Sequence, residues 1–213
     1  NVELQPNGDL LLSGVATEEG TGHLVRLSFD GEVIFFERIG SHHDVEVTPE
    51  GRIAALTRNS LWIPDISESD KVRDNGIAIV DAQGQKTEEA SLTEVLQTSP
   101  GIFQFQRLPR MNKENRRTLI DLLHTNSLEF TRFPEFADRH PLYEEGNVLI
   151  SIRHQDTVAV IDWETKELVW AWGQGELSGQ HDAQQLENGN FLIFDNGLKN
   201  QRSRVIEIDP VTG

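Results

Sequence analysis

Three histidines recur near the start of a repeated stretch of the sequence. His43 and His181 are each followed by an aspartate and a short apolar run, and His124 begins a more diverged copy. An imidazole can act as a nucleophile, as a general acid or base, or as a metal ligand. The chain contains no cysteine, which excludes thiolate nucleophiles and thiolate metal sites. Histidine is therefore the natural nucleophile in this sequence.

The repeat that carries these histidines predicts β-hairpins. The first phrase, an apolar strand, a turn ending in glycine and a second apolar strand, occurs at 2–12, 43–56, 124–150 (with an insertion) and 181–193. A second phrase, in which an apolar strand reaches an aspartate and turns through Gly or Thr-Lys, follows at 24–33, 77–84, 158–170 and 205–213. Tight-turn residues between short apolar runs are typical of hairpins.

Two hairpins per repeat make a four-stranded sheet of about 40–50 residues, which is the blade of a β-propeller. We therefore predict an all-β fold, a β-propeller of four-stranded blades of which this chain covers roughly four. A β-sandwich shares the short strands but does not require a recurring phrase. In a propeller, equivalent residues entering the innermost strands converge on the central channel. The histidines at 43, 124 and 181 are thus expected around one pocket.

The repeat also predicts the domain organisation, which is a single propeller domain over residues 1–213. The first residue falls one position after the repeated histidine, and the last lies in a turn without its outgoing strand. Both ends are therefore expected to cut through hairpins of a larger propeller. An insertion around 96–123 could include a short helix at 111–123 and could act either as a lid or as a surface excursion.

Several motifs in a fixed order resemble the bacterial arylsulfate sulfotransferases. They read His-Thr-Asn-Ser at 124–127, Ser-Ile-Arg-His-Gln at 151–155, Gly-Gln-His-Asp-Ala at 179–183 and Phe-Asp-Asn-Gly at 194–197, and the upstream His-His-Asp at 42–44 also fits. The resemblance implies a six-bladed propeller. It implies transfer of a sulfuryl group from an aryl sulfate ester to a phenol through a sulfated histidine, without a nucleotide sulfate donor. It also implies a periplasmic or secreted protein, although no signal peptide begins this chain.

The resemblance assigns roles residue by residue. His181 matches the histidine that becomes sulfated. His124, Asn126 and Arg153 match residues that hold the sulfuryl oxygens, and His43 matches a further pocket histidine. No cofactor and no metal are expected.

These side chains suit the chemistry. Arg153 offers a permanently charged fork for an oxyanion, and Asn126 offers neutral amide donors. A second histidine, His43 or His124, could protonate the departing phenolate, since a phenol has a pKa of about 10. Aromatic substrates also need flat apolar walls, for which the candidates are Trp62, Phe103, Phe105 and Phe194.

The formal net charge of −16 opposes binding to nucleic acids and to anionic membranes. No apolar run is long enough to span a bilayer. The expected partners are small aromatic sulfate esters and phenols, while the sequence leaves the oligomeric state open. Because a negative field repels an anionic donor, Arg153 and the histidines would have to form a local positive pocket.

Two alternative functions remain at this stage. One is a propeller that binds a ligand or protein through the same face without catalysis. The other is a metal-dependent propeller hydrolase, with the three histidines, Asp44 and Asp182 as ligands, although Arg153 beside a cation would be unfavourable. The triplet Asp195-Asn196-Gly197 could offer oxygen ligands to calcium, but it is also a common turn sequence.

Two further expectations concern neighbours of the motifs. Strand alternation predicts that His154 points away from the side on which Arg153 lies. The tryptophans near the repeated turn, Trp163, Trp170 and Trp172, are expected to pack between blades.

Overall fold

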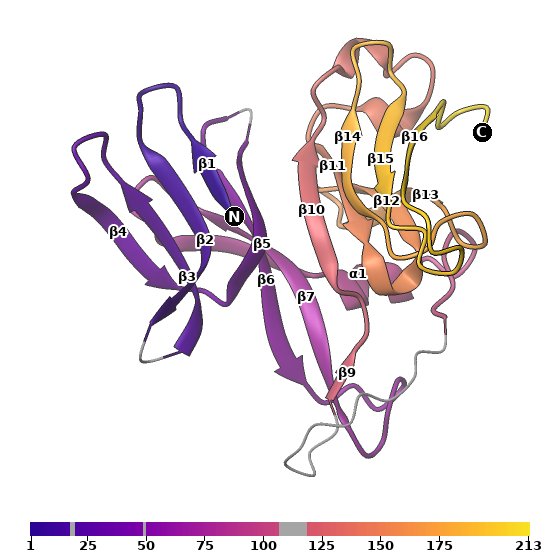
Figure 1. Cartoon of the computed structure of the whole chain (residues 1–213), viewed down its shortest axis with the longest axis horizontal. Helices are drawn as coiled ribbons and strands as arrows, with labels where there is room; N and C mark the ends of the chain where they lie inside the picture. Colours follow the sequence, from indigo (N-terminus) through magenta and orange to yellow (C-terminus); the bar gives the residue numbers. More distant parts are fainter. Residues whose placement is uncertain (18–19, 49, 107–118) are drawn as a thin grey trace. The chain divides into compact units, whose positions relative to one another are not determined.

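Short strands make up about half of the chain, and all those described except β9 pair antiparallel with a neighbour in sequence. The computed structural model describes residues 1–17, 20–48, 50–106 and 119–213. These residues form four sheets, in which the strands follow one another in chain order (Figure 1). The all-β fold built from propeller blades is thus confirmed. The described residues divide into two compact units, Asn1–Asn59 with Asn75–Leu92 and Ser60–Asp74 with Thr93–Gly213, called the first and second units below.

Two sheets begin in the first unit. One sheet contains β1 (Val2–Leu4), β2 (Leu10–Thr17), β3 (Gly20–Leu27) and β4 (Val33–Arg38). The other contains β5 (Ser41–Val47), β6 (Ile53–Leu61), β7 (Lys71–Val80) and β8 (Lys86–Ser91), and β6 and β7 continue into the second unit. Part of the buried apolar core of this unit forms a cluster of Leu11, Leu24, Phe35, Val45, Ile53, Ala55 and Val80.

The second unit holds the other two sheets. One contains β10 (Thr125–Phe130), β11 (Asn147–Ile152), β12 (Thr157–Asp162) and β13 (Glu167–Trp172). The other contains β14 (His181–Gln185), β15 (Phe191–Asp195) and β16 (Arg204–Ile208). The described helical segments are short: α1 (Leu92–Gln97), η1 (Pro134–Phe136), η2 (Pro141–Tyr143) and η3 (Arg153–Gln155). None of the helices in the described part of the chain is long and apolar enough to cross a membrane.

The hairpin turns follow the glycines of the repeated phrase. Gly51 and Gly189 have φ of +79° and +86°, a conformation that residues with a side chain rarely adopt. The amide of Gly51 donates to Thr48 O at 2.8 Å, and that of Gly189 donates to Leu186 O at 2.9 Å. The turn signal read from the sequence therefore sets the strand boundaries.

The predicted insertion around 96–123 is described in part. Residues 107–118, which include most of the expected helix, lie outside the described residues. The end of that expected helix is instead a strand, β9 (Leu119–Asp121), which pairs in parallel with Lys71–Arg73 of β7. The helix prediction is wrong for these residues, because their backbone groups join the edge of a sheet that lies far away in sequence.

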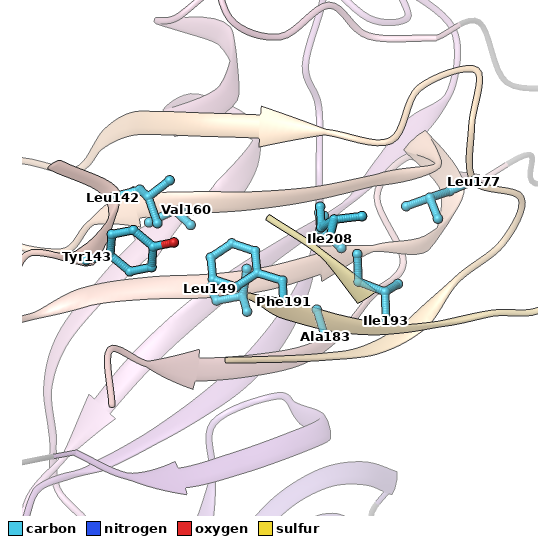
Figure 2. Packing of buried hydrophobic residues seen from close by; sticks show 10 residues of the cluster. Leu142, Tyr143, Leu149, Val160, Leu177, Ala183, Phe191, Ile193 and Ile208 are labelled. Atoms are coloured by element: carbon cyan, nitrogen blue, oxygen red, sulfur yellow. The ribbon is translucent and has the colours of Figure 1, made fainter. Parts of the chain in front are cut away.

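A single apolar cluster joins the two sheets of the second unit (Figure 2). Phe191 of β15 lies at its centre, 5.4 Å from the ring of Trp170 and 6.4 Å from that of Tyr143. The Tyr143 hydroxyl donates to Gly189 O at 2.7 Å, so this buried phenol has a partner. Because Trp170 lies on β13, the expected packing of tryptophans between blades is confirmed at this position.

Replacing Phe191 tests this cluster. The side chain is 2% exposed, so Phe191→Ala should lower the free energy of unfolding by about 3–5 kcal/mol through lost burial and a cavity. Val205 is 64% exposed, and Val205→Ala should change that energy by less than about 0.5 kcal/mol. Urea denaturation followed by circular dichroism gives both values. Equal losses in the two variants would contradict the assignment of Phe191 to the core.

Candidate functional site

The strand registers show which residues hold equivalent positions in the repeat. In three sheets, a buried residue of the first strand pairs with the fourth residue after the glycine of the first hairpin turn. The buried residues that hold this position are Val45, Leu128 and Ala183. Two positions before them stand His43, Asn126 and His181. His124 lies four positions before Leu128 and directly precedes β10. In the ladders, His181 pairs with the fifth residue after its turn glycine, as Ser127 does. His43 and Asn126 fall inside the irregular parts of their strands. The shared repeat position of the three histidines therefore stays a prediction.

Bulges interrupt the ladder near this position in all three strands. The register shifts between Ser41 and Val45, between Thr125 and Ser127 and between His181 and Ala183. A bulge takes up extra residues in one strand without changing its partner, so equal spacing in sequence does not give equal position in the ladder.

His43 belongs to the first unit. It is exposed and has φ of +53°, and its Nδ1 lies 2.5 Å from Nδ1 of His42. His42 is buried, and its Nε2 lies 3.0 Å from both Thr57 O and Asn75 Nδ2. The exposed histidine of the pair is thus the one that the repeat register selects. The other proposed site residues belong to the second unit.

The start of β14 is anchored to the sheet before it. Gln180 is fully buried, and its side-chain amide donates to Thr157 O at 2.8 Å and to Ser151 Oγ at 3.3 Å. The Asn126 amide donates to Gln180 O at 2.9 Å. These bonds fix the residue immediately before His181. The structure therefore brings Asn126 and His181 together.

The protonation of the His181 ring follows from its neighbours. Its Nδ1 lies 3.2 Å from Gly179 O and 2.6 Å from Asn196 Oδ1. A backbone carbonyl can only accept a hydrogen bond, so Nδ1 carries the proton and Nε2 of the neutral ring has a free lone pair. A nucleophilic nitrogen needs that lone pair.

Asn196 contacts His181, whereas the sequence analysis considered it only as part of a turn or of a calcium-binding triplet. The Asp195 carboxylate accepts from the Gly197 amide at 3.1 Å and from the Ser178 amide at 2.9 Å, which makes the predicted turn and holds Asn196 against His181. Burial raises the pKa of Asp195, but these hydrogen bonds and Arg204 outweigh it and hold the pKa below its usual value. The signal that could have identified Asn196 was its place in the Phe-Asp-Asn-Gly motif.

A second cluster surrounds His124. The Nδ1 of His124 lies 2.8 Å from Asp121 Oδ2, and Nδ1 of His154 lies 2.6 Å from Asp121 O. The two imidazole rings lie 4.6 Å apart with a tilt of 37°. Arg73 Nη1 also reaches Asp121 Oδ2, at 3.2 Å. The sequence analysis identified neither Asp121 nor Arg73.

The position of His154 corrects the strand-alternation argument. The strand β11 ends at Ile152, and Arg153–Gln155 form the 3₁₀ turn η3. Successive side chains alternate between two faces only in a strand, whereas a 3₁₀ turn has three residues per turn. His154 consequently faces His124.

The electrostatics of this cluster keep Asp121 charged. Burial raises its pKa, but the hydrogen bond from His124 and the charges of His124 and Arg73 outweigh burial, so the pKa lies below its usual value. Burial lowers the pKa of His154, and the charges of His124 and Arg153 add to this effect against the opposing influence of Asp121. A buried carboxylate thus lies beside an imidazole that favours its neutral form.

Arg153 begins η3 and is half-buried. Its guanidinium makes no hydrogen bond or ion pair with another residue in the described part of the chain. Five N–H donors of a permanent cation are thereby left for a ligand.

The cluster around Asp121 could also offer ligands to a metal ion. Asp121, His124 and His154 each present one ligand atom within 4.8 Å of the others. Arg73 and Nδ1 of His124 both engage Oδ2 of Asp121, Nδ1 of His154 engages its backbone O, and Oδ1 is buried without a hydrogen-bond partner among the residues that the structure describes. The cluster shares only His124 with the metal-ligand set considered from the sequence.

The four aromatic candidates for substrate walls differ in exposure. Phe194 is 42% exposed and pairs with His181 in the β14–β15 ladder. Phe103 is buried and contacts Phe105 edge to face at 5.1 Å. Trp62 is exposed. Of the four, Phe194 lies next to a proposed site residue, because it pairs with His181 across the ladder.

Comparison with known proteins settles the family. The family model described as arylsulfotransferase (ASST) matches residues 2–213. The chain belongs to the arylsulfotransferase family. No curated protein matches this sequence.

Solved structures give more distant likenesses to this arylsulfotransferase. They include a protein of unknown function from Bacteroides caccae (12% identity, TM-score 0.42, 98% of this chain and 77% of that one). They also include the PQQ domain of a pyranose dehydrogenase from Coprinopsis cinerea (14% identity, TM-score 0.46, covering 97% of this chain and 47% of that one). A third is the β-propeller domain of Cps50 (Swd1) from Myceliophteria thermophila (12% identity, TM-score 0.38, covering 91% of this chain and 61% of that one). The chain therefore spans less than two thirds of the second and third structures, and the likenesses carry no information on activity.

The lowered pKa of His154 predicts a pH dependence of stability in the arylsulfotransferase. The unfolded chain takes up a proton at this histidine near pH 6.5, whereas the folded chain does so only at lower pH. The stabilisation of the folded state that comes from the lowered pKa of His154 is therefore present above pH 6.5 and is lost as the pH falls below that value. Urea denaturation at pH 7.5 and 5.5 should show a smaller loss in His154→Gln than in the unmodified protein. Identical losses would contradict the burial of a neutral His154.

Proposed function

We propose that this arylsulfotransferase moves a sulfuryl group from an aryl sulfate ester to a phenolic acceptor through a sulfated His181, without a nucleotide sulfate donor. The observation that carries the proposal is the pair of acceptors at His181 Nδ1, Gly179 O and Asn196 Oδ1, at 3.2 and 2.6 Å. They leave Nε2 as the nucleophilic nitrogen. Membership in the family supports the reaction class.

The reaction divides into two transfers at sulfur. In the first, the Nε2 lone pair of His181 forms the N–S bond while the S–O bond to the aryl group breaks and its electron pair goes to the phenolate. In the second, the acceptor oxygen forms a new S–O bond and the N–S bond returns its pair to Nε2. A covalent intermediate of this kind replaces one difficult step by two easier ones.

The negative charge of the sulfuryl group needs fixed positive groups. The guanidinium of Arg153 is permanently charged and has no ionic partner among the described residues, so its donors can hold sulfuryl oxygens. One N–H of the Asn126 amide donates to Gln180 O, and the other is left for a sulfuryl oxygen. His43 enters the proposal on the resemblance alone, as a further pocket histidine.

The family also supports the wider context of the proposal. The substrates would be small aromatic sulfate esters and phenols, and the protein would work in the periplasm or outside the cell. No cofactor takes part in this scheme.

Formation of the covalent intermediate tests the proposal. Incubation of the full-length protein with 4-nitrophenyl sulfate, without an acceptor, should add the mass of one sulfuryl group and release one equivalent of phenol. His181→Ala should abolish both, because no other residue in the scheme offers the attacking lone pair. Intact-mass measurement and phenol absorbance record the two events.

The matched control for this experiment is His140→Asn, at the residue that caps η2 by accepting from the Leu142 amide at 3.1 Å. This variant should form the adduct as the unmodified protein does. Treatment with a chelator should also leave adduct formation unchanged. Absence of an adduct in the unmodified protein would favour a non-catalytic binding propeller, and loss of phenol release on chelation would favour a metal-dependent hydrolase.

The role of Asn196 gives a second test. Asn196→Ala removes one acceptor from Nδ1–H and should slow adduct formation by about tenfold, which corresponds to one hydrogen bond of about 1.4 kcal/mol. Asn196→Asp keeps an acceptor at that position and should retain the Nδ1–H form. Single-turnover phenol release gives the rate, and ¹⁵N chemical shifts of the His181 ring report its tautomer. An alanine variant with an unchanged rate and tautomer would remove Asn196 from the mechanism.

A further inference from the structure

A buried carboxylate that the proposed reaction does not yet use lies directly behind His124. The Asp121 side chain is 3% exposed, and its Oδ2 lies 2.8 Å from His124 Nδ1. The side chain of His124 is 30% exposed. One end of the imidazole therefore contacts a buried anion, while the ring as a whole remains accessible.

The hydrogen bond determines where the protons of His124 lie. Asp121 is charged, so it can only accept, and Nδ1 of His124 is the donor. The other ring nitrogen, Nε2, is an acceptor in the neutral ring and a donor in the imidazolium.

We propose that Asp121 is a positioning residue that makes His124 the general acid of sulfuryl transfer and, in the second step, its general base. This inference rests on the proposed function, because it assigns the proton transfers that accompany sulfation of His181. The arrangement differs from the role in which His124 only holds sulfuryl oxygens.

Protons and electrons balance in both steps. As the S–O bond to the donor breaks, the phenolate oxygen takes the proton from Nε2 of the His124 imidazolium, which becomes neutral while Nδ1–H stays on Asp121. As the acceptor phenol attacks the sulfated His181, its O–H proton passes to Nε2 of His124. The imidazolium is regenerated, and no other reactant is required.

The groups around His124 allow this cycle. Arg73 binds the same carboxylate oxygen at 3.2 Å and, through the parallel pairing of β7 with β9, lies directly opposite Asp121. His154 lies over the ring, and burial favours its neutral form, so it adds no positive charge against the imidazolium. Arg153 is the remaining cation next to this histidine pair, and its charge is free for the sulfuryl group.

Dependence on the leaving group distinguishes this role from a structural one. A general acid matters most for a basic leaving group, and its removal costs about 10²- to 10⁴-fold. Asp121→Asn should therefore slow single-turnover phenol release from phenyl sulfate by about 100-fold or more. With 4-nitrophenyl sulfate, whose leaving group is a weaker base and needs less protonation, the rate should fall by less than about tenfold.

Two matched variants complete the experiment. His140→Asn changes a histidine that caps η2 and has no role in this scheme, so it should leave the rates with both donors unchanged. His124→Gln should show the leaving-group dependence of Asp121→Asn, and combining the two should add no further effect on phenyl sulfate. Thermal unfolding monitors folding of every variant.

The outcomes separate this inference from the proposed function. Equal slowing of both donors in Asp121→Asn, or a further loss when it is added to His124→Gln, would overturn the role of Asp121. A wild-type protein that forms no adduct with either donor would overturn the proposed function instead. Adduct formation from 4-nitrophenyl sulfate that survives in Asp121→Asn supports both.

Discussion

The unpaired edge of β14 is the constraint on which the site depends. This strand pairs with β15 on one side only, so its remaining polar backbone groups need other partners. Side chains of β10 supply them: Ser127 Oγ accepts from the Ala183 amide at 3.2 Å, and Glu129 Oε2 from the Gln185 amide at 2.7 Å. The Asn126 amide binds Gln180 O in the same way. Two sheets are thereby joined at the point where β14 begins, and His181 is held in place as a consequence.

A second consequence is that the histidines of the second unit's site have fixed tautomers. His124, His154 and His181 each face an oxygen acceptor with Nδ1, from a carboxylate in the first case and from a backbone carbonyl in the other two. An imidazole held in this way presents Nε2 to a ligand. The scaffold therefore fixes the tautomer of each ring, and in the proposed reaction this preorganisation reduces what must be rearranged.

The sequence predicted the parts of this structure that depend on local chemistry. The turn glycines, such as Gly51 and Gly189, set the hairpins and hence the blades, and the motif order indicated the family. It did not predict the bulge between Thr125 and Ser127, because a bulge leaves no mark on residue spacing. Nor could it reveal the contact of Arg73 with Asp121, which are 48 residues apart and meet through a parallel strand pair that has no turn signature.

The same contacts bear on how charge is distributed in a chain of net charge −16. The two buried carboxylates closest to the site histidines each have an arginine partner, Arg73 for Asp121 at 3.2 Å and Arg204 for Asp195 at 2.9 Å. Paired charges of opposite sign largely cancel beyond their immediate surroundings, and solvent ions screen the exposed acidic residues. Arg153 has no such partner among the described residues, so its charge is not cancelled locally. This cation at the start of η3 is thus an exception to the strongly negative balance of the chain.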